Sequence, residues 1–158
     1  MIKHSKRKGI ILAGGEGTRL KPITSSVSKQ LLPVYDKPMI YYSLSTLMLC
    51  GVKDILIITT QYSQKLFKKL LGNGNKWGVN ISYKIQYKSE GISHGISLAE
   101  EFIEDKNVVV VLGDNIFHGS NLVSFLYSAD SRTKGGTIFA YPVRDPKRYG
   151  VVNLDKKG

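Results

Sequence analysis

Short runs of apolar residues divide the chain into segments and predict the strands of a sheet. The most apolar runs lie at residues 9–13, 54–59 and 107–112. Because apolar side chains occupy successive positions in these runs, both faces of each strand are expected to be buried, as in a parallel sheet. Residues 81–86 alternate between apolar and polar side chains, which predicts a half-buried strand. Residues 136–141 and 151–154 predict two further strands.

Helical spacing of apolar residues fills the segments between these runs. The predicted helices lie at residues 39–49, 62–71, 92–103 and 122–128. Pro38 suits the first turn of the first helix, because proline lacks the N–H group that would be unpaired there. In the second helix, Tyr62, Leu66 and Leu70 share one face, which predicts an amphipathic surface helix. The alternation of strands and helices predicts an α/β fold with a mainly parallel sheet.

The charge of the chain is unevenly distributed. The 158 residues include 23 basic and 12 acidic side chains, which gives a net charge of +11. Residues 1–90 hold 15 basic and 4 acidic side chains, whereas residues 91–158 hold 8 of each. A positive surface favours anionic partners, and nucleic acids, nucleotides and sugar phosphates all qualify. A composition with 42% hydrophobic residues excludes a disordered chain, and the length predicts a single domain.

The remaining composition excludes several classes of protein. Cys50 is the single cysteine, which excludes an intrachain disulfide and a cysteine-based metal site. It follows three apolar residues, so a buried thiol is expected rather than a reactive one. No run approaches the ~18 apolar residues of a membrane span, and the apolar run behind the basic N-terminus is too short for a signal peptide. A cytoplasmic location and no membrane partner are therefore expected.

The first predicted strand leads into a loop rich in glycine. In open α/β sheets, ligands bind beyond the carboxyl ends of the strands. Three segments of this chain follow strands in that way: residues 14–19, 86–95 and 113–117. Gly14, Gly15 and Gly17 allow the backbone of the first segment to approach a ligand closely, with its amides directed at phosphate oxygens. Arg19 adds a planar, permanently charged group for phosphate.

Two familiar phosphate-binding motifs do not match this loop. A dinucleotide fingerprint requires glycine where Leu20 stands, and a Walker A loop requires a Gly-Lys-Ser/Thr sequence that does not follow. On the composition of the loop alone, a plain glycine turn between strand and helix is an equal alternative. The strand before the loop, Arg19 within it and residues 28–33 after it favour a binding site.

A longer pattern around the loop resembles a known family. LAGGEGTRL at residues 12–20 is followed by Pro22, by Thr24 and by SKQLLPV at residues 28–34. This spacing closely resembles the signature of the sugar-1-phosphate nucleotidyltransferases, and it is far more specific than a glycine triplet. The resemblance spans essentially the whole chain, because it continues in residues 37–42, 112–117 and 148–152.

The resemblance implies a fold and an activity. The expected fold is a Rossmann-like three-layer α/β domain with a mainly parallel, mixed sheet of the nucleotide-diphospho-sugar transferase type. Members that use dTTP and glucose 1-phosphate are the most similar, which implies thymidylyl transfer to that sugar phosphate with release of pyrophosphate. A uridylyl- or cytidylyltransferase acting on another sugar 1-phosphate is an alternative, as is a non-catalytic nucleotide-binding fragment. Binding of nucleic acid is not expected, because the basic residues lie on separate predicted elements.

The same resemblance implies roles for individual residues. The implied nucleotide-binding residues are Leu12, Gly14, Gly15, Gly17, Thr18, Arg19, Gln30, Gln86 and Gly91. Arg19 and Lys29 are the implied catalytic residues, whose charges would stabilise the phosphates. Asp114 is the implied metal ligand, and a carboxylate beside phosphates suggests Mg²⁺. Tyr149 and Gly150 are implied contacts of the sugar phosphate.

Each charged or aromatic candidate has a simpler alternative role. The alternatives are a solvated lysine for Lys29, a turn-capping aspartate for Asp114 and a half-buried aromatic at a strand end for Tyr149. The segment after Gln86 departs from the family pattern, because it lacks the usual prolines and has Ser-His-Gly in place of Ala-Gln-Ala. The preference for thymidine over uridine is therefore open. His94 is expected to line the pocket or to begin a helix rather than to catalyse.

The family pattern normally continues well past residue 158. The resemblance divides the chain into a nucleotide-binding part, residues 1–118, and the start of a sugar-binding part, residues 119–158. A Glu-Lys-Pro segment that contacts sugar and phosphate, and a second metal carboxylate, are expected beyond this end. We therefore expect the 158 residues to bind nucleotide weakly, to turn over poorly and to expose apolar surface. The full-length family form is expected to be a homo-oligomer.

Overall fold

A four-stranded parallel sheet forms the centre of the molecule. The computed structural model describes residues 5–155. The strands are β1 (Lys8–Ala13), β4 (Asp54–Thr59), β5 (Asn80–Ile85) and β6 (Val108–Leu112), in the spatial order β5-β4-β1-β6. Ile10 of β1 lies between Leu56 of β4 and Val110 of β6. The four strands predicted between residues 9 and 112 are confirmed, with boundaries that differ by no more than one residue.

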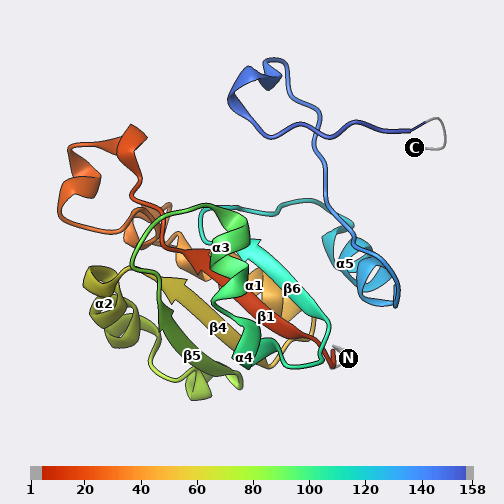
Figure 1. Cartoon of the computed structure of the whole chain (residues 1–158), viewed down its shortest axis with the longest axis horizontal. Helices are drawn as coiled ribbons and strands as arrows, with labels where there is room; N and C mark the ends of the chain where they lie inside the picture. Colours follow the sequence, from red (N-terminus) through yellow and green to blue (C-terminus); the bar gives the residue numbers. More distant parts are fainter. Residues whose placement is uncertain (1–4, 156–158) are drawn as a thin grey trace.

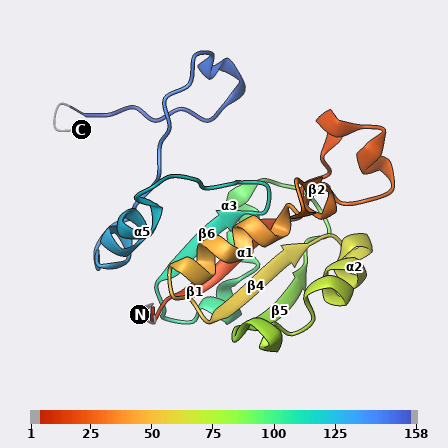
Figure 2. The same cartoon turned by 180° about the vertical axis from the view of Figure 1, so that it is seen from behind.

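Helices cover both faces of the sheet and produce three layers (Figures 1 and 2). The helices α1 (Ile40–Leu49) and α2 (Gln61–Leu71) lie on one face, and α3 (Ile92–Ser97) and α4 (Glu100–Ile103) lie on the other. Successive side chains of β1 point to opposite faces, so that Ile11 packs with Leu47 of α1 while Ile10 packs with Ala99. The predicted Rossmann-like α/β architecture is therefore confirmed.

The amphipathic helix α2 buries a different face from the predicted one. The predicted face consists of Tyr62, Leu66 and Leu70. The residues that are actually buried are Ser63, Phe67 and Leu71. Phe67 has no polar atom and is fully buried, whereas the Tyr62 hydroxyl needs a partner and donates at the surface to the Ser26 carbonyl, at 3.0 Å. The prediction of the buried face is therefore wrong by one position along the helix.

The helix predicted over residues 92–103 is interrupted. Helix α3 ends at Ser97, and α4 begins only at Glu100. At Ala99 the backbone N–H donates to the Ile96 carbonyl, three residues back, instead of continuing the pattern of four. This tighter turn changes the direction of the chain while Ala99 stays fully buried against the sheet.

Several short elements do not appear in the sequence pattern. The strands β2 (Pro33–Val34) and β3 (Lys37–Pro38) form an antiparallel pair outside the main sheet, and within residues 5–155 antiparallel pairing is confined to this hairpin. The 3-10 helices are η1 (Thr18–Leu20), η2 (Ile23–Ser25), η3 (Lys29–Leu31), η4 (Asn75–Trp77) and η5 (Pro146–Arg148). Across residues 5–155, no helix has the length and apolar character needed to cross a membrane.

The chain leaves the body of the domain after helix α5 (Leu122–Asp130). Helix α5 packs Leu126 against the core, but residues 133–155 extend away from the sheet (Figure 1). The predicted strands at residues 136–141 and 151–154 are wrong, since within residues 5–155 neither segment pairs with a strand. A strand needs such a neighbour for its backbone hydrogen bonds. Their apolar side chains are exposed instead, Ile138 at 68% and Leu154 at 74%.

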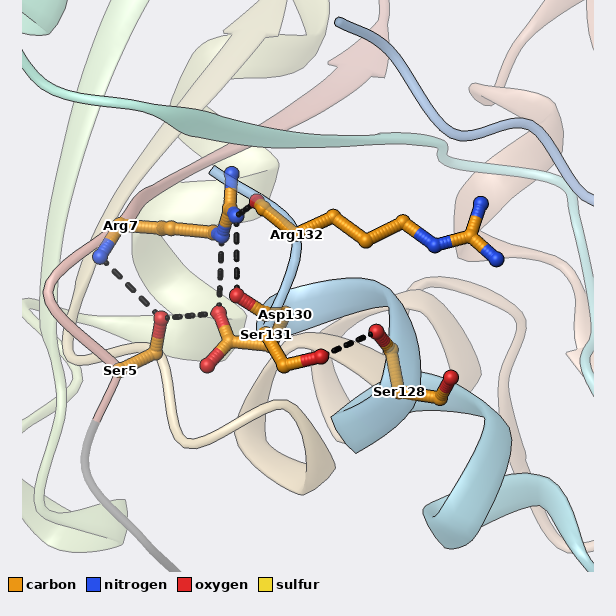
Figure 3. Close-up of polar contacts among 6 residues, drawn as sticks. All are labelled: Ser5, Arg7, Ser128, Asp130, Ser131 and Arg132. Carbon is orange, nitrogen blue, oxygen red and sulfur yellow. Dashed lines mark hydrogen bonds and ion pairs between the residues drawn. The ribbon is translucent and has the colours of Figure 1, made fainter. Parts of the chain in front are cut away.

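Polar contacts join the end of α5 to the segment that precedes β1 (Figure 3). The Arg7 Nε atom lies 2.8 Å from Asp130 Oδ1, and Arg7 Nη2 donates to the carbonyls of Asp130 at 3.0 Å and Arg132 at 2.6 Å. The Ser5 hydroxyl donates to the same Asp130 oxygen at 2.7 Å. Because the last carbonyls of a helix lack partners within the helix, Arg7 satisfies groups that would otherwise be unpaired. We call Ser5, Arg7 and Asp130 the α5 latch.

Replacing Arg7 by methionine is expected to destabilise the fold by about 1–3 kcal/mol, because Asp130 would stay largely buried without its charged partner. Alkylation of Cys50 can report separation of α5 from the core. Burial raises the pKa of the Cys50 thiol to about 11, Asp130 adds to this, and Arg7 lowers it. Loss of the Arg7 charge alone would therefore slow alkylation, so faster alkylation in the variant would report exposure of the thiol. A urea midpoint measures the stability.

The neighbouring residue offers a matched control for the latch. Lys8 pairs with Glu104, whose side chain is 64% exposed, so Glu104→Gln is expected to change stability by less than about 0.5 kcal/mol. Equal urea midpoints for the Arg7 and Glu104 variants would show that the latch does not hold α5.

Candidate active site

The order of the strands reverses beside β1, and this is where open α/β sheets bind ligands. From β1 the chain proceeds outward through β4 to β5, and it then returns to β6 on the other side of β1. The loops that follow β1 and β6 therefore diverge and leave a crevice beyond the carboxyl ends of these strands. The loop after β1 begins at Gly14, and the loop after β6 begins at Gly113.

An ion pair joins these two loops across the crevice. Lys29 Nζ lies 2.8 Å from Asp114 Oδ2, and both side chains are about one-third exposed. Lys29 begins η3, and Asp114 follows β6 by two residues. Gly113 makes the approach possible, because a Cβ atom there would lie 2.9 Å from Gln30 Cγ and 3.1 Å from the Leu12 carbonyl oxygen. The predicted catalytic lysine and the predicted metal ligand are thus brought together.

The glycine loop turns sharply before η1. Gly17 has a φ of 63°, in the left-handed region that favours glycine. The Thr24 hydroxyl donates to the Gly17 carbonyl at 2.8 Å. A Cβ atom at Gly17 would lie 3.0 Å from Thr24 Cγ2 and 3.1 Å from Lys29 Cβ. The turn therefore depends on glycine for its conformation and for the close packing of Lys29 beneath it.

Residues from all three predicted segments line one cavity of about 200 Å³. The predicted site residues that line it are Leu12, Gly14, Gly15, Gln30, Gln86, Gly91 and Asp114. Gln30 and Gln86 are 4% and 7% exposed. The Ser28 hydroxyl donates to Gln30 Oε1 at 2.6 Å, so the oxygen of the Gln30 amide faces Ser28 and its NH₂ group faces away from Ser28. Two buried amides at one cavity can provide both donors and acceptors for a polar ligand.

Other predicted site residues lie outside this cavity. Thr18 and Arg19 are exposed in η1, and Gly17 precedes them. Tyr149 and Gly150 are exposed on the segment that extends away from the sheet (Figure 1). The structure does not bring these two residues to the crevice, so their sugar-phosphate role stays a prediction.

Some residues of the site were missed by the reasoning from sequence. Tyr62 and Tyr87 line an adjoining cavity of about 460 Å³, which also includes Gly14 and Gln86. Gly95 allows α3 to lie against β1, because a Cβ atom there would be 2.9 Å from Leu12 Cδ2. A glycine inside a predicted helix was the available signal for such a close approach.

Ser43 of α1 also contacts the site from behind. Its fully buried hydroxyl donates to the Leu112 carbonyl at 3.1 Å and lies 3.4 Å from the Asn115 carbonyl, on either side of Asp114. This contact ties helix α1 to the loop that carries the carboxylate. No sequence pattern indicated it, because α1 and β6 are far apart in the chain.

The donor set around Asp114 suits one particular kind of metal site. Within residues 5–155, no group of three or more histidine, cysteine or acidic side chains could hold a metal ion by itself. Asp114 is the carboxylate that lines the 200 Å³ cavity. Mg²⁺ commonly takes one or two carboxylates and completes its shell with water and phosphate oxygens. The residues present therefore fit Mg²⁺ that arrives with a phosphate ligand.

Comparison with curated proteins gives a consistent assignment. The family described as "Nucleotidyl transferase" matches residues 8–158. The glucose-1-phosphate thymidylyltransferase of Xanthomonas campestris pv. campestris (strain B100) is 57% identical over 154 residues, which cover 98% of this chain and 52% of the relative. The protein of the same description from Mycolicibacterium smegmatis (strain ATCC 700084 / mc(2)155) is 50% identical over 151 residues, covering 96% of this chain and 52% of the relative.

Solved structures agree with these relatives. A crystal structure of a Bacillus anthracis protein assigned as a glucose-1-phosphate thymidylyltransferase, in complex with a sucrose, superposes with a TM-score of 0.89 at 39% identity. That match covers 96% of this chain and 61% of the other. A UDP-glucose pyrophosphorylase complexed with UDP-glucose superposes with a TM-score of 0.61 at 26% identity, covering 79% of this chain and 53% of the other.

The matches cover nearly all of this chain but only part of its relatives. The chain spans about half the length of the curated relatives it matches. The family match, by contrast, covers the sheet, the glycine loop and the Asp114 loop described above. The chain therefore belongs to the nucleotidyl transferase family.

Proposed function

We propose that the chain carries the nucleotide-binding site of a glucose-1-phosphate thymidylyltransferase. A phosphate oxygen of glucose 1-phosphate attacks the α-phosphorus of dTTP, the bond between that phosphorus and the bridging oxygen breaks, and dTDP-glucose and pyrophosphate form. The observation that carries the proposal is the Lys29–Asp114 pair, which stands at a cavity lined by the glycine loop and by Gln86.

The chemistry requires neutralisation of charge more than a base. The attacking phosphate oxygen is already anionic near neutral pH, so that alignment and electrostatic stabilisation dominate. Arg19 is exposed beside the loop, where its guanidinium can contact the β- and γ-phosphates that leave as pyrophosphate. Gly14, Gly15 and Gly17 would present backbone amides to the triphosphate, with Thr18 beside them. Lys29 would exchange the Asp114 carboxylate for a phosphate as its anionic partner.

Asp114 would hold Mg²⁺ together with the oxygens of the triphosphate. When bound, Mg²⁺ supplies positive charge to those oxygens. Because Asp114 contacts Lys29, a Mg²⁺ ion held by Asp114 would lie close to the lysine ammonium group. In the free protein, the same carboxylate pairs with the lysine charge.

The proposed base rests on the cavity and on structural similarity, whereas the proposed sugar rests on the relatives. Gln86 would contact the pyrimidine, and Gln30 and Gly91 line the same cavity. The thymidylyltransferase match in structure is closer than the UDP-glucose pyrophosphorylase match, in both TM-score and identity, which favours dTTP over UTP. Tyr149 and Gly150 would contact the sugar phosphate in the part that begins near residue 119. Glucose 1-phosphate follows from the names of the relatives.

Thermal unfolding in the presence of nucleotides tests the proposal. With Mg²⁺ present, dTTP at about 100 times its Kd is expected to stabilise the chain by about 2.7 kcal/mol, and ATP at the same concentration by less. Any pyrophosphate released should require dTTP, glucose 1-phosphate and Mg²⁺ together. Equal stabilisation by ATP and dTTP, or salt-sensitive binding of DNA without a response to nucleotides, would contradict the proposal.

A further inference from the structure

His94 contacts the amide of Gln86 directly. His94 lies on α3, with its side chain 28% exposed, and its Nδ1 atom is 3.2 Å from Gln86 Nε2. Gln86 follows β5, and its backbone N–H donates to the Thr59 carbonyl at 2.8 Å. The close approach of α3 to β1 at Gly95 holds the imidazole in this position. A residue that departs from the family pattern therefore lies behind the amide that would contact the base.

This contact requires one tautomer of His94. With Gln86 Nε2 facing Nδ1, the NH₂ group donates and Nδ1 accepts, so the imidazole carries its proton on Nε2 in this arrangement. The carbonyl oxygen Oε1 then points away from His94, and it lies against Gly14. Within residues 5–155, no group donates a hydrogen bond to Oε1. Gln86 and Gly14 line the same two cavities, so the wall they share offers an acceptor.

An acceptor at this wall discriminates among pyrimidines. Thymine and uracil carry an N3–H donor between two carbonyl groups, whereas cytosine has an unprotonated N3 acceptor beside an amino group. Oε1 can accept from N3–H of thymine or uracil, but it opposes the lone pair of cytosine N3. If the amide turned over, its NH₂ group would suit cytosine instead.

We propose that His94 is a positioning residue that fixes the orientation of the Gln86 amide and thereby makes the site prefer pyrimidines with an N3–H donor over cytosine. The inference rests on the proposed function, because it requires Gln86 to face the base. His94 itself lines neither of the two cavities that Gln86 lines, so it would act through the amide.

Glu90 provides the competing partner for His94. Its Oε2 atom lies 3.5 Å from the same Nδ1 atom, and a carboxylate can only accept. In the described part of the chain, Glu90 is the ionisable group that contacts the imidazole. An imidazole with a hydrogen on Nδ1 would donate to Glu90 and could not accept from Gln86, so the contact with the amide requires the tautomer that leaves Nδ1 unprotonated.

The test compares two nucleotides across matched variants of the 158-residue chain. The measured quantity is the ratio of the dCTP and dTTP dissociation constants, determined by calorimetric titration with Mg²⁺. His94→Leu removes the acceptor and is expected to lower this ratio about tenfold. A tenfold change in relative affinity corresponds to the loss of one favourable hydrogen bond to the base. His94→Asp restores an acceptor without a donor. Its added negative charge should weaken both nucleotides equally and keep the ratio near that of the unmodified chain.

A further variant separates positioning from general stability. Ser97→Ala removes a hydroxyl that donates to the His94 carbonyl at 2.9 Å on the same helix, and the ratio should not change.

The outcomes distinguish this inference from the proposed function. If the unmodified chain binds dTTP with Mg²⁺ but His94→Leu keeps the full preference against dCTP, the role of His94 is overturned and the proposed function stands. A loss of preference in His94→Asp as large as in His94→Leu also overturns it. If the unmodified chain binds no nucleotide, both are overturned.

Discussion

Replacing Asp114 by asparagine is expected to remove the gain in dTTP affinity that Mg²⁺ provides, a loss of at least about tenfold at saturating Mg²⁺. Asparagine keeps the shape of the side chain but is neutral, and it is a poor ligand for Mg²⁺. In the absence of Mg²⁺ the same variant should bind dTTP at least as well as the unmodified chain. In the unmodified chain Lys29 is paired with the Asp114 carboxylate at 2.8 Å. In the variant this carboxylate is gone, so the lysine charge would be free to interact with the triphosphate. Calorimetric titration with Mg²⁺ and with a chelator measures both effects.

The opposite end of β6 provides the control for this experiment. Asp105 is exposed and precedes the strand that Asp114 follows, so Asp105→Asn changes the net charge equally without altering the crevice. Its response to Mg²⁺ should equal that of the unmodified chain. A full Mg²⁺ gain in the Asp114 variant would show that the metal binds elsewhere, and an equal loss in both variants would show an effect of net charge alone.

Replacing Gly14 by alanine is expected to weaken dTTP binding about tenfold while leaving the fold intact. A Cβ atom at this position would overlap Gln86 Oε1 and lie 3.3 Å from Gln86 Cδ. The end of a flexible side chain can withdraw, so the cost falls on the contact between Gln86 and the base rather than on the core. Titration with dTTP and a urea unfolding curve measure the two quantities separately.

A double-mutant cycle shows whether the effect acts through Gln86. If Gly14→Ala weakens binding by displacing that amide, it should have little further effect in a Gln86→Ala background. Additive losses would mean that the methyl group disturbs the phosphate loop instead. Gly136→Ala controls for the general effect of replacing glycine, because a Cβ atom there would meet nothing within 4 Å, on the segment beyond α5.

Both predictions concern residues whose type and place the sequence pattern indicates. The pattern predicts Asp114 just after a buried strand, and β6 ends two residues before it. It predicts that Gly14 begins a phosphate loop, and β1 ends one residue before it. Buried strands consist of runs of apolar residues, so the sequence shows where each strand ends. In a parallel sheet, the carboxyl ends of the strands lie at one edge.

The errors have an equally specific cause. Residues 136–141 and 151–154 have the composition of strands, but a strand forms only where a neighbour accepts its hydrogen bonds, and the pattern of one segment does not reveal that neighbour. The buried face of α2 was misjudged because Tyr62 and Phe67 have similar apolar area. The partner of the Tyr62 hydroxyl, the Ser26 carbonyl, comes from a distant loop.

The sequence by itself determined the four-stranded parallel sheet, the loops that carry the candidate chemistry and the family to which the chain belongs. The tertiary structure alone decided which side chains meet. Lys29 and Asp114 are 85 residues apart in the chain, yet Lys29 Nζ lies 2.8 Å from Asp114 Oδ2, and Gln86 Nε2 lies 3.2 Å from His94 Nδ1. The physical reason is that periodic burial is a property of each segment. A contact between loops depends on the order of the strands and on the few glycines, such as Gly113 and Gly95, that let the backbones approach.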